Sequence, residues 1–184
     1  MTLAASAAPA HSADALVLFG ATGDLAYKKI FPALYAMCQR DRNALKGPVI
    51  GVASSKWNVE QLRTRVHESI QQLGGEIDSA ALERLLAALQ YVSGDYTDAS
   101  TFAALRLELR GARHPAFYLA IPPALFPTVI NGIKVAGLAE GGRLIVEKPF
   151  GRDLASAREL NRIALEAFCE SAIFRIDHFL GKEA

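Results

Sequence analysis

The feature that most constrains this chain is a short apolar run that ends in a glycine-containing turn. The run Ala15–Phe19 is followed by Gly20-Ala-Thr-Gly23 and then by a stretch with helical spacing. Gly20 permits a tight turn, and Gly23 lets a phosphate approach the backbone. The helix that follows would present its N-terminal N–H groups and partial positive charge to that phosphate. Strand, turn and helix in this order predict a dinucleotide site, with Ala26 as the small residue that lets helix and sheet pack closely.

Composition places the chain among globular domains and excludes several classes of function. Its 184 residues carry 20 Lys and Arg against 19 Asp and Glu, so no overall field attracts nucleic acid or an anionic membrane. No apolar run is long enough to span a bilayer. Residues 1–13 are interpreted as a disordered leader, because they lack the charged start and apolar core of a secretory signal. Cys38 and Cys169 occur in helix-like stretches without metal-ligand spacing, which predicts buried free thiols, a reducing compartment and no metal site.

Apolar runs alternate with helix-like segments along the chain. Further strands are expected at residues 48–53, 91–93, 115–121, 143–147 and 172–176, and helices at 59–73, 78–90, 97–110, 123–138 and 153–168. Pro32 predicts a kink or a fresh start in the first helix, which carries Leu25, Ile30, Leu34 and Cys38 inward. Strands that alternate with helices indicate right-handed crossovers. Residues 14–184 are therefore predicted to form one α/β domain, with a Rossmann-like, doubly wound, mostly parallel sheet and helices on both faces.

Ligands bind such a sheet beyond the carboxyl ends of its strands, so the residues that leave those ends are candidates by topology. They are Gly20–Asp24, Ser54–Lys56, Asp95, Pro122, Glu147–Lys148 and Asp177–His178.

The end of the second strand bears on the choice of cofactor. An NAD-specific domain usually has a carboxylate there for the ribose hydroxyls, whereas this chain has Ser54, Ser55 and Lys56. A hydroxyl and an ammonium would bind a 2′-phosphate that a carboxylate would repel. The pattern favours NADP over NAD, and the alternative interpretation is a solvated loop.

Two strand ends are rich in functional groups. Residues 147–153 place a carboxylate and an ammonium side by side before a proline, and residues 177–183 contain an acid, an imidazole and a base. His and Lys at a strand end suit a phosphate or a sugar hydroxyl, and an Asp beside them could stabilise a protonated histidine. The alternative is that both stretches are surface charges that close the sheet.

Three blocks of the sequence resemble the signature motifs of the glucose-6-phosphate dehydrogenase family. They are Gly20-Ala-Thr-Gly-Asp-Leu-Ala26, Glu147-Lys-Pro-Phe-Gly-Arg-Asp-Leu154 and Arg175-Ile-Asp-His-Phe-Leu-Gly-Lys-Glu183, in the family's order and near its spacing. The resemblance implies oxidation of C1 of glucose 6-phosphate to 6-phosphogluconolactone, with hydride passed to NADP⁺ in the oxidative pentose phosphate pathway.

The resemblance also implies roles for individual residues. Lys148 would touch both cofactor and sugar, and Pro149 would follow a cis peptide bond. Asp177 would stabilise the charged catalytic histidine, so Asp177 and Lys148 are the catalytic candidates. The cofactor-binding candidates are Gly20, Ala21, Thr22, Gly23, Asp24, Leu25, Lys29, Ser54, Lys56, Asp95, Tyr96, Pro122, Glu147 and Lys148, and the substrate-binding candidates are Lys148, His178, Phe179 and Lys182.

Three departures from the family pattern matter. Ser54 stands where the family often has Arg for the 2′-phosphate, which leaves Lys56 to serve and NAD as a possible cofactor. Phe179 stands where a Tyr is common. The family's general base is a histidine in a downstream domain, whereas His11, His67 and His114 are interpreted as surface residues.

The resemblance therefore implies that these 184 residues are the N-terminal coenzyme-binding part. Hydride transfer from an alcohol needs a base and an oriented site. We expect the polypeptide alone to bind nucleotide with little or no dehydrogenase activity, and the full-length form to be a cytoplasmic homodimer or homotetramer.

Two other functions are possible on the sequence alone. One is a stand-alone nucleotide-binding module that senses redox state or serves as a partner subunit. The other is a short-chain reductase or epimerase, which would need a Tyr four residues before a Lys. None of the five Tyr residues has Lys at that spacing, so this second alternative is disfavoured.

Overall fold

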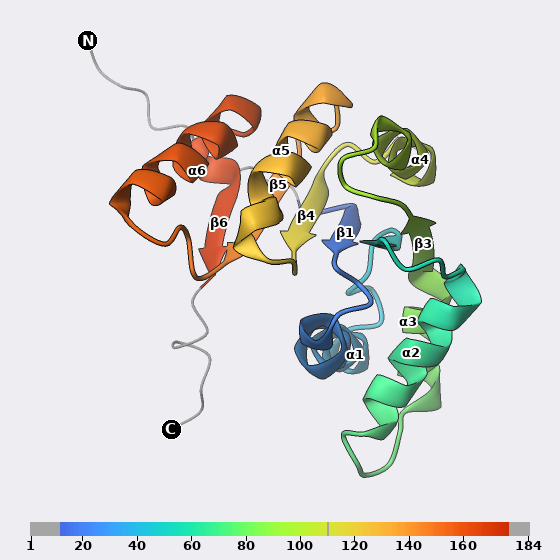
Figure 1. The fold of residues 1–184 in the computed structure, drawn as a ribbon. Coiled ribbons are helices and arrows are strands. Elements are labelled where there is room, and N and C mark those ends of the chain that lie inside the picture. Colours follow the sequence, from blue (N-terminus) through green and yellow to red (C-terminus); the bar gives the residue numbers. More distant parts are fainter. Residues whose placement is uncertain (1–11, 110, 177–184) are drawn as a thin grey trace.

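One all-parallel sheet organises the computed structural model, which describes residues 12–109 and 111–176 (Figure 1). Its strands are β1 (Ala15–Phe19), β2 (Val49–Ala53), β3 (Leu89–Ser93), β4 (Pro115–Leu119), β5 (Arg143–Glu147) and β6 (Ile173–Ile176). Their spatial order is β3-β2-β1-β4-β5-β6. The order reverses between β1 and β4, and a crevice for ligands forms at the carboxyl ends of the strands on either side of such a reversal. The predicted Rossmann-like fold is confirmed.

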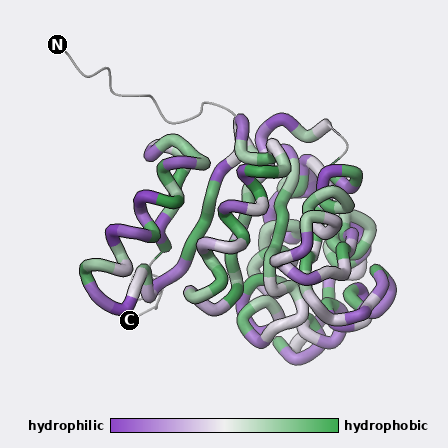
Figure 2. Tube along the Cα trace, turned by 45° about the horizontal axis from the view of Figure 1, so that its top comes forward, coloured by the Kyte–Doolittle hydropathy of each residue, from purple (hydrophilic) through white to green (hydrophobic). Residues whose placement is uncertain are grey.

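Helices cover both faces of this sheet. One face carries η1 (Ala26–Ile30), a π-helical segment that continues into α1 (Phe31–Arg40), and then α2 (Val59–Gln71) and α3 (Ser79–Ala88). The other carries α4 (Ala99–Leu109), α5 (Phe126–Val135) and α6 (Leu154–Ala167), with the short 3₁₀ segments η2 (Pro123–Leu125) and η3 (Glu170–Ala172). Figure 2 shows α6 alternating between hydrophilic and hydrophobic residues, as a helix with one buried face should.

Each face of the sheet has its own hydrophobic core. On the α4–α6 face, Phe102, Phe126 and Leu160 pack with strand residues such as Phe19 and Phe117. On the α1–α3 face, helix residues pack with Leu18, Val49 and Leu89. The strands therefore read as nearly continuous apolar runs, because a parallel sheet covered on both sides has no solvent face.

Local sequence signals explain where the helices begin. Asn58 and Asp153 form capping boxes at the starts of α2 and α6, and the Asp78 side chain accepts a hydrogen bond from the Ala81 N–H at the start of α3. Pro32 is the second residue of α1, directly after the π-helical segment η1. The sequence predicted a kink or a fresh start at this proline; the structure instead shows an unbroken helix that changes from π to α geometry beside it.

Some sequence expectations need correction. Cys38 is buried as predicted, but Cys169 is exposed and follows the end of α6. That prediction is wrong because α6 ends at Ala167 and turns Phe168, its C-cap residue, into the core. The strand predicted at residues 91–93 begins at Leu89, where α3 ends two residues early. Leu25 is half-buried rather than buried.

Residues 1–11, most of the predicted leader, lie outside the described residues. Within residues 12–109 and 111–176, no helix is long and apolar enough to cross a membrane.

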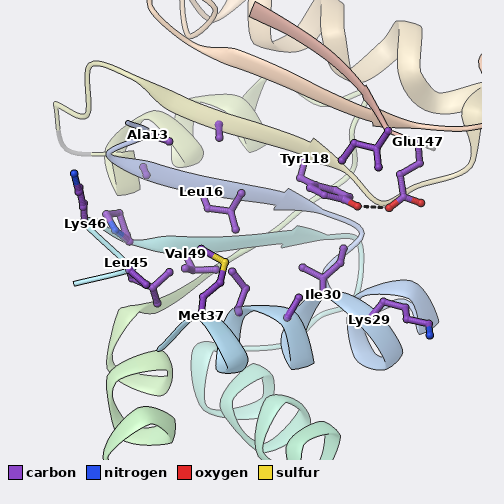
Figure 3. Close-up of a pocket in the computed structure, with 18 residues that line it drawn as sticks. Ala13, Leu16, Lys29, Ile30, Met37, Leu45, Lys46, Val49, Tyr118 and Glu147 are labelled. Atoms are coloured by element: carbon purple, nitrogen blue, oxygen red, sulfur yellow. Dashed lines mark hydrogen bonds between the residues drawn. The ribbon is translucent and has the colours of Figure 1, made fainter. Parts of the chain in front are cut away.

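The face of the sheet beside α1 is not covered over its whole width. An apolar hollow of about 460 Å³ opens there, with Leu16, Ala116, Tyr118 and Ile176 on the sheet side and Met37 on the helix side (Figure 3). Helices α1–α3 lie between β1 and β3 in the chain and cover that half of the sheet. Within the described residues, no helix covers the same face of the β4–β6 half.

Candidate dinucleotide-binding site

The glycine turn after β1 is the centre of the site. Gly20 has a φ of +84°, a conformation that glycine adopts without strain. The Gly23 N–H donates to the Gly20 carbonyl at 2.9 Å, and the Gly20 N–H donates to the Val52 carbonyl at 2.8 Å. These bonds fix the turn to the end of β2.

The two glycines of the turn serve different purposes. A Cβ at Gly20 would lie 2.2 Å from the Ala120 carbonyl oxygen, so this glycine is needed for packing against the end of β4. A Cβ at Gly23 would meet only the Gly20 carbonyl oxygen, at 3.2 Å, and Gly23 is exposed. Packing alone does not require the second glycine. Its open surface is where a phosphate can approach the backbone.

The helix after the turn points its N-terminus at this surface. The Tyr27 N–H donates to the Gly23 carbonyl at 3.1 Å, so the helix begins directly behind Gly23. Ala26 is fully buried, which confirms the close helix–sheet packing expected of it. Asp24 pairs with Lys28 at 2.8 Å on the surface, and the hydrogen bond from Lys28 lowers the pKa of the Asp24 carboxyl.

The end of β2 lies against the same turn. The Ser55 hydroxyl donates to Thr22 Oγ1 at 3.1 Å, while Ser54 and Lys56 are exposed. The structure thus brings the predicted 2′-phosphate residues beside the predicted pyrophosphate turn. Ala21, on this turn, is buried and packs in the core of the α1–α3 face, so it shapes the turn from inside.

The end of β3 contributes Asp95 and Tyr96 in different ways. The Tyr96 hydroxyl accepts from the Gly20 N–H at 3.0 Å and donates to the Val52 carbonyl at 3.1 Å, while its ring packs edge-on against Phe19. Tyr96 therefore ties the glycine turn to β2. The Asp95 carboxylate instead accepts from the N–H and hydroxyl of Thr97, and both bonds lower its pKa.

The ends of β4 and β5 meet at a buried carboxylate. Glu147 is 7% exposed, and it accepts a hydrogen bond from the Tyr118 hydroxyl. Burial, followed by this contact, raises the pKa of Tyr118 well above its usual range. Figure 3 shows the pair at one end of the apolar hollow, the end at which Lys29 also lies.

The described strand-end candidates thus lie along one edge of the sheet. The peptide bond between Lys148 and Pro149 has the cis form that the resemblance implied. Pro122 is exposed where the chain leaves β4. Asp177, His178, Phe179 and Lys182 fall outside the described residues.

Sequence reasoning found Tyr96 but missed three other hydroxyls that support the site. Tyr118 donates to Glu147 on β5, whereas Tyr91 and Ser93 donate to the Ser55 carbonyl in the loop after β2. The available signal was a phenolic hydroxyl in an otherwise apolar strand, because a buried tyrosine usually has a hydrogen-bond partner.

A strand, a glycine turn and a helix N-terminus at the point where strand order reverses define a dinucleotide-binding α/β domain. Residues 17–184 match the family described as glucose-6-phosphate dehydrogenase, NAD binding domain. The chain therefore belongs to the glucose-6-phosphate dehydrogenase family, as its nicotinamide-cofactor-binding domain.

Individual relatives agree with this assignment. The chain is 43% identical over 172 residues to glucose-6-phosphate 1-dehydrogenase 1 of Mycobacterium bovis, and 41% identical over 177 residues to glucose-6-phosphate 1-dehydrogenase of Saccharomyces cerevisiae. These alignments cover 94% and 90% of this chain but only 36% and 35% of the relatives. The chain thus spans about a third of the length of these curated relatives.

Solved structures show the same correspondence. The crystal structure of the Mycobacterium avium glucose-6-phosphate 1-dehydrogenase superposes with a TM-score of 0.86 at 45% identity, over 93% of this chain and 37% of that one. A glucose-6-phosphate dehydrogenase in complex with its substrate glucose 6-phosphate gives a TM-score of 0.80 at 37% identity, over 95% of this chain and 39% of that one.

Proposed function

We propose that this chain binds NADP⁺ as the coenzyme-binding part of a glucose-6-phosphate dehydrogenase. The whole enzyme would transfer hydride from C1 of glucose 6-phosphate to the nicotinamide ring and release 6-phosphogluconolactone. The observation that best supports this proposal is the contact between the glycine turn and the end of β2. The hydroxyl bond from Ser55 to Thr22 joins the glycine turn to a strand end that bears Lys56 and no carboxylate.

Electrostatics supports NADP⁺ over NAD⁺ in this proposal. A 2′-phosphate at the end of β2 would meet the exposed ammonium of Lys56 and the exposed hydroxyl of Ser54. A charge-assisted contact of this kind contributes about 1.5–3 kcal/mol. A single lysine thus suffices for a measurable preference.

The reacting end of the site would lie toward the apolar hollow. Lys29 and Glu147 both line its wall, and Lys148 follows Glu147 directly. In the proposed enzyme, Lys148 holds cofactor and sugar together. Asp177, His178, Phe179 and Lys182, which lie outside the described residues, keep their predicted roles at the substrate.

The family resemblance assigns removal of the proton from the sugar hydroxyl to a histidine, and the described part of the chain brings no histidine to this edge. His67 lies within α2, and His114 precedes β4 at the opposite edge of the sheet. We therefore expect the polypeptide 1–184 to bind nucleotide without appreciable turnover. The cytoplasmic location and the dimeric or tetrameric state of the full-length enzyme stay predictions from the sequence.

Calorimetric titration with NADP⁺ and NAD⁺ tests the cofactor assignment. We expect NADP⁺ to bind more tightly, and Lys56→Ala to weaken NADP⁺ about tenfold while leaving NAD⁺ unchanged. Lys134→Ala is the matched control, because Lys134 pairs with Glu166 on the helical surface of α5 and α6. Equal binding of both nucleotides by the unmodified chain would refute the NADP⁺ preference. Binding of neither would refute nucleotide binding by this chain alone.

A further inference from the structure

The carbonyl oxygen of Ser55 is held by three donors. It accepts from the Trp57 N–H at 2.7 Å, from the Tyr91 hydroxyl at 2.8 Å and from the Ser93 hydroxyl at 2.9 Å. The first bond is local, whereas the other two come from the neighbouring strand β3. This loop carbonyl is thus held both by its own turn and by two side chains of the neighbouring strand.

The local bond places Lys56 at the centre of a three-residue turn. An N–H that bonds to the carbonyl two residues earlier closes a γ-turn around the residue between them. Lys56 is therefore displayed at the tip of this turn, exposed, while the turn is held from below by Tyr91 and Ser93. On its other side, Ser55 contacts Thr22 of the glycine turn.

The support itself has a fixed position. Tyr91 lies opposite Gly51 and Ser93 lies opposite Ala53 in the parallel register of β2 and β3. A Cβ at Gly51 would lie 2.8 Å from the Ala21 Cβ and 2.9 Å from Leu62 Cδ2, so this position is closely packed, and the Tyr91 ring lies at ordinary contact distance, 3.4 Å. Burial raises the pKa of Tyr91 to about 12, so its hydroxyl keeps its proton and stays a donor at neutral pH.

We propose that Tyr91 and Ser93 are positioning residues for cofactor choice. They hold the Ser55–Trp57 turn in the shape in which Lys56 receives the 2′-phosphate, and they thereby set the preference for NADP⁺ over NAD⁺. This inference rests on the proposed function, and it adds residues on β3 that would not touch the nucleotide.

The physical reason is the entropy of binding. Ordering a mobile lysine-bearing loop around a phosphate costs free energy at the moment of binding, whereas a turn that is already ordered avoids most of that cost. Loss of the support should weaken only the contacts that the turn makes. The glycine turn is held by Val52 and Tyr96 instead, so its contacts with the pyrophosphate should persist.

The test compares dissociation constants for NADP⁺ and NAD⁺ in Tyr91→Phe, Ser93→Ala and the double variant. We expect each single change to lower the ratio of NAD⁺ to NADP⁺ dissociation constants about threefold to tenfold, with NAD⁺ binding within about twofold of the unmodified chain. Ser93→Thr keeps a hydroxyl and should keep the ratio. Tyr35→Phe is the matched control, because its hydroxyl accepts from the Asp78 N–H at 2.7 Å, away from the site.

The outcomes separate this inference from the proposed function. A purely structural role would weaken both nucleotides in parallel, and an unchanged ratio would show no coupling, so either result overturns the inference alone. An unmodified chain that binds both nucleotides equally would overturn the NADP⁺ preference and this inference together. Adenosine 2′-monophosphate and adenosine 5′-monophosphate give an independent comparison. The ratio of the 5′-monophosphate to the 2′-monophosphate dissociation constant should fall in the same variants.

Discussion

Replacement of Gly20 by alanine should separate backbone strain from crowding at the site. At this position φ is +84°, and the added Cβ would lie 2.2 Å from the Ala120 carbonyl oxygen and 2.9 Å from Ile121 Cγ2. The first neighbour is backbone within the site, which cannot move aside as a flexible side chain can. Gly74 provides the control, because its φ is +72° and a Cβ there would have nothing within 4 Å.

The expected magnitudes follow from these two environments. A left-handed conformation costs an L-residue about 1–2 kcal/mol, partly offset by about 0.4–1 kcal/mol from the stiffer unfolded chain. Gly74→Ala should therefore destabilise by about 1 kcal/mol. Gly20→Ala adds crowding of about 1–3 kcal/mol and weakens the bond from its N–H to Val52, worth about 1 kcal/mol. Its total should reach about 3–5 kcal/mol.

Denaturant unfolding followed by circular dichroism measures both changes, and calorimetry on the same samples measures NADP⁺ binding. Gly74→Ala should bind NADP⁺ as tightly as the unmodified chain does. Gly20→Ala should bind NADP⁺ weakly even at denaturant concentrations well below its unfolding midpoint, where it is folded. The reasoning is refuted if Gly20→Ala destabilises the fold no more than Gly74→Ala does.

Three further predictions concern other parts of the molecule. Gly23→Ala should change the free energy of unfolding by about 1 kcal/mol or less yet weaken NADP⁺ at least about tenfold, and parallel loss of stability and binding would contradict it. Asp14→Ala should destabilise the fold by about 2 kcal/mol, because its carboxylate accepts from the N–H groups of Arg113 and His114 at 2.8 and 2.9 Å. Burial acts to raise the pKa of Asp14, but those N–H groups outweigh it and lower the pKa, so this stabilisation should be lost as pH falls through the lowered value. Burial raises the pKa of Tyr91 from 10.0 to about 12, so its contribution should be complete below pH 10 and lost between about pH 10 and 12. Tyr91→Phe should flatten the pH dependence of unfolding in that range, and an unchanged slope would count against it.

Local patterns were enough to predict most of the fold. The glycine turn and the apolar strands depend on neighbours a few residues away, so they can be recognised from one sequence. Element ends were less accurate, as at Leu89, because the residue that leaves a helix for a strand is chosen by packing. Cys169 was misjudged for the same reason, since burial depends on where α6 stops.

Candidate site residues divide along a similar line. The sequence indicated which residues leave the carboxyl ends of the strands. The structure joins Ser55 to Thr22, and it joins Tyr96, a candidate from the family resemblance, to Gly20. The structure alone revealed that Asp95 uses its carboxylate within its own loop, and that Tyr118 donates to Glu147.

The sequence by itself determined the fold class, the glycine turn and the family, because each rests on residue types at short, fixed spacing. Only the tertiary structure decided how that turn and the Lys56 turn are held. Their supports are hydroxyls on β3 and its following loop, 36 to 76 residues away along the chain. Such contacts exist only once parallel strands have paired in one register, and no local pattern encodes that register.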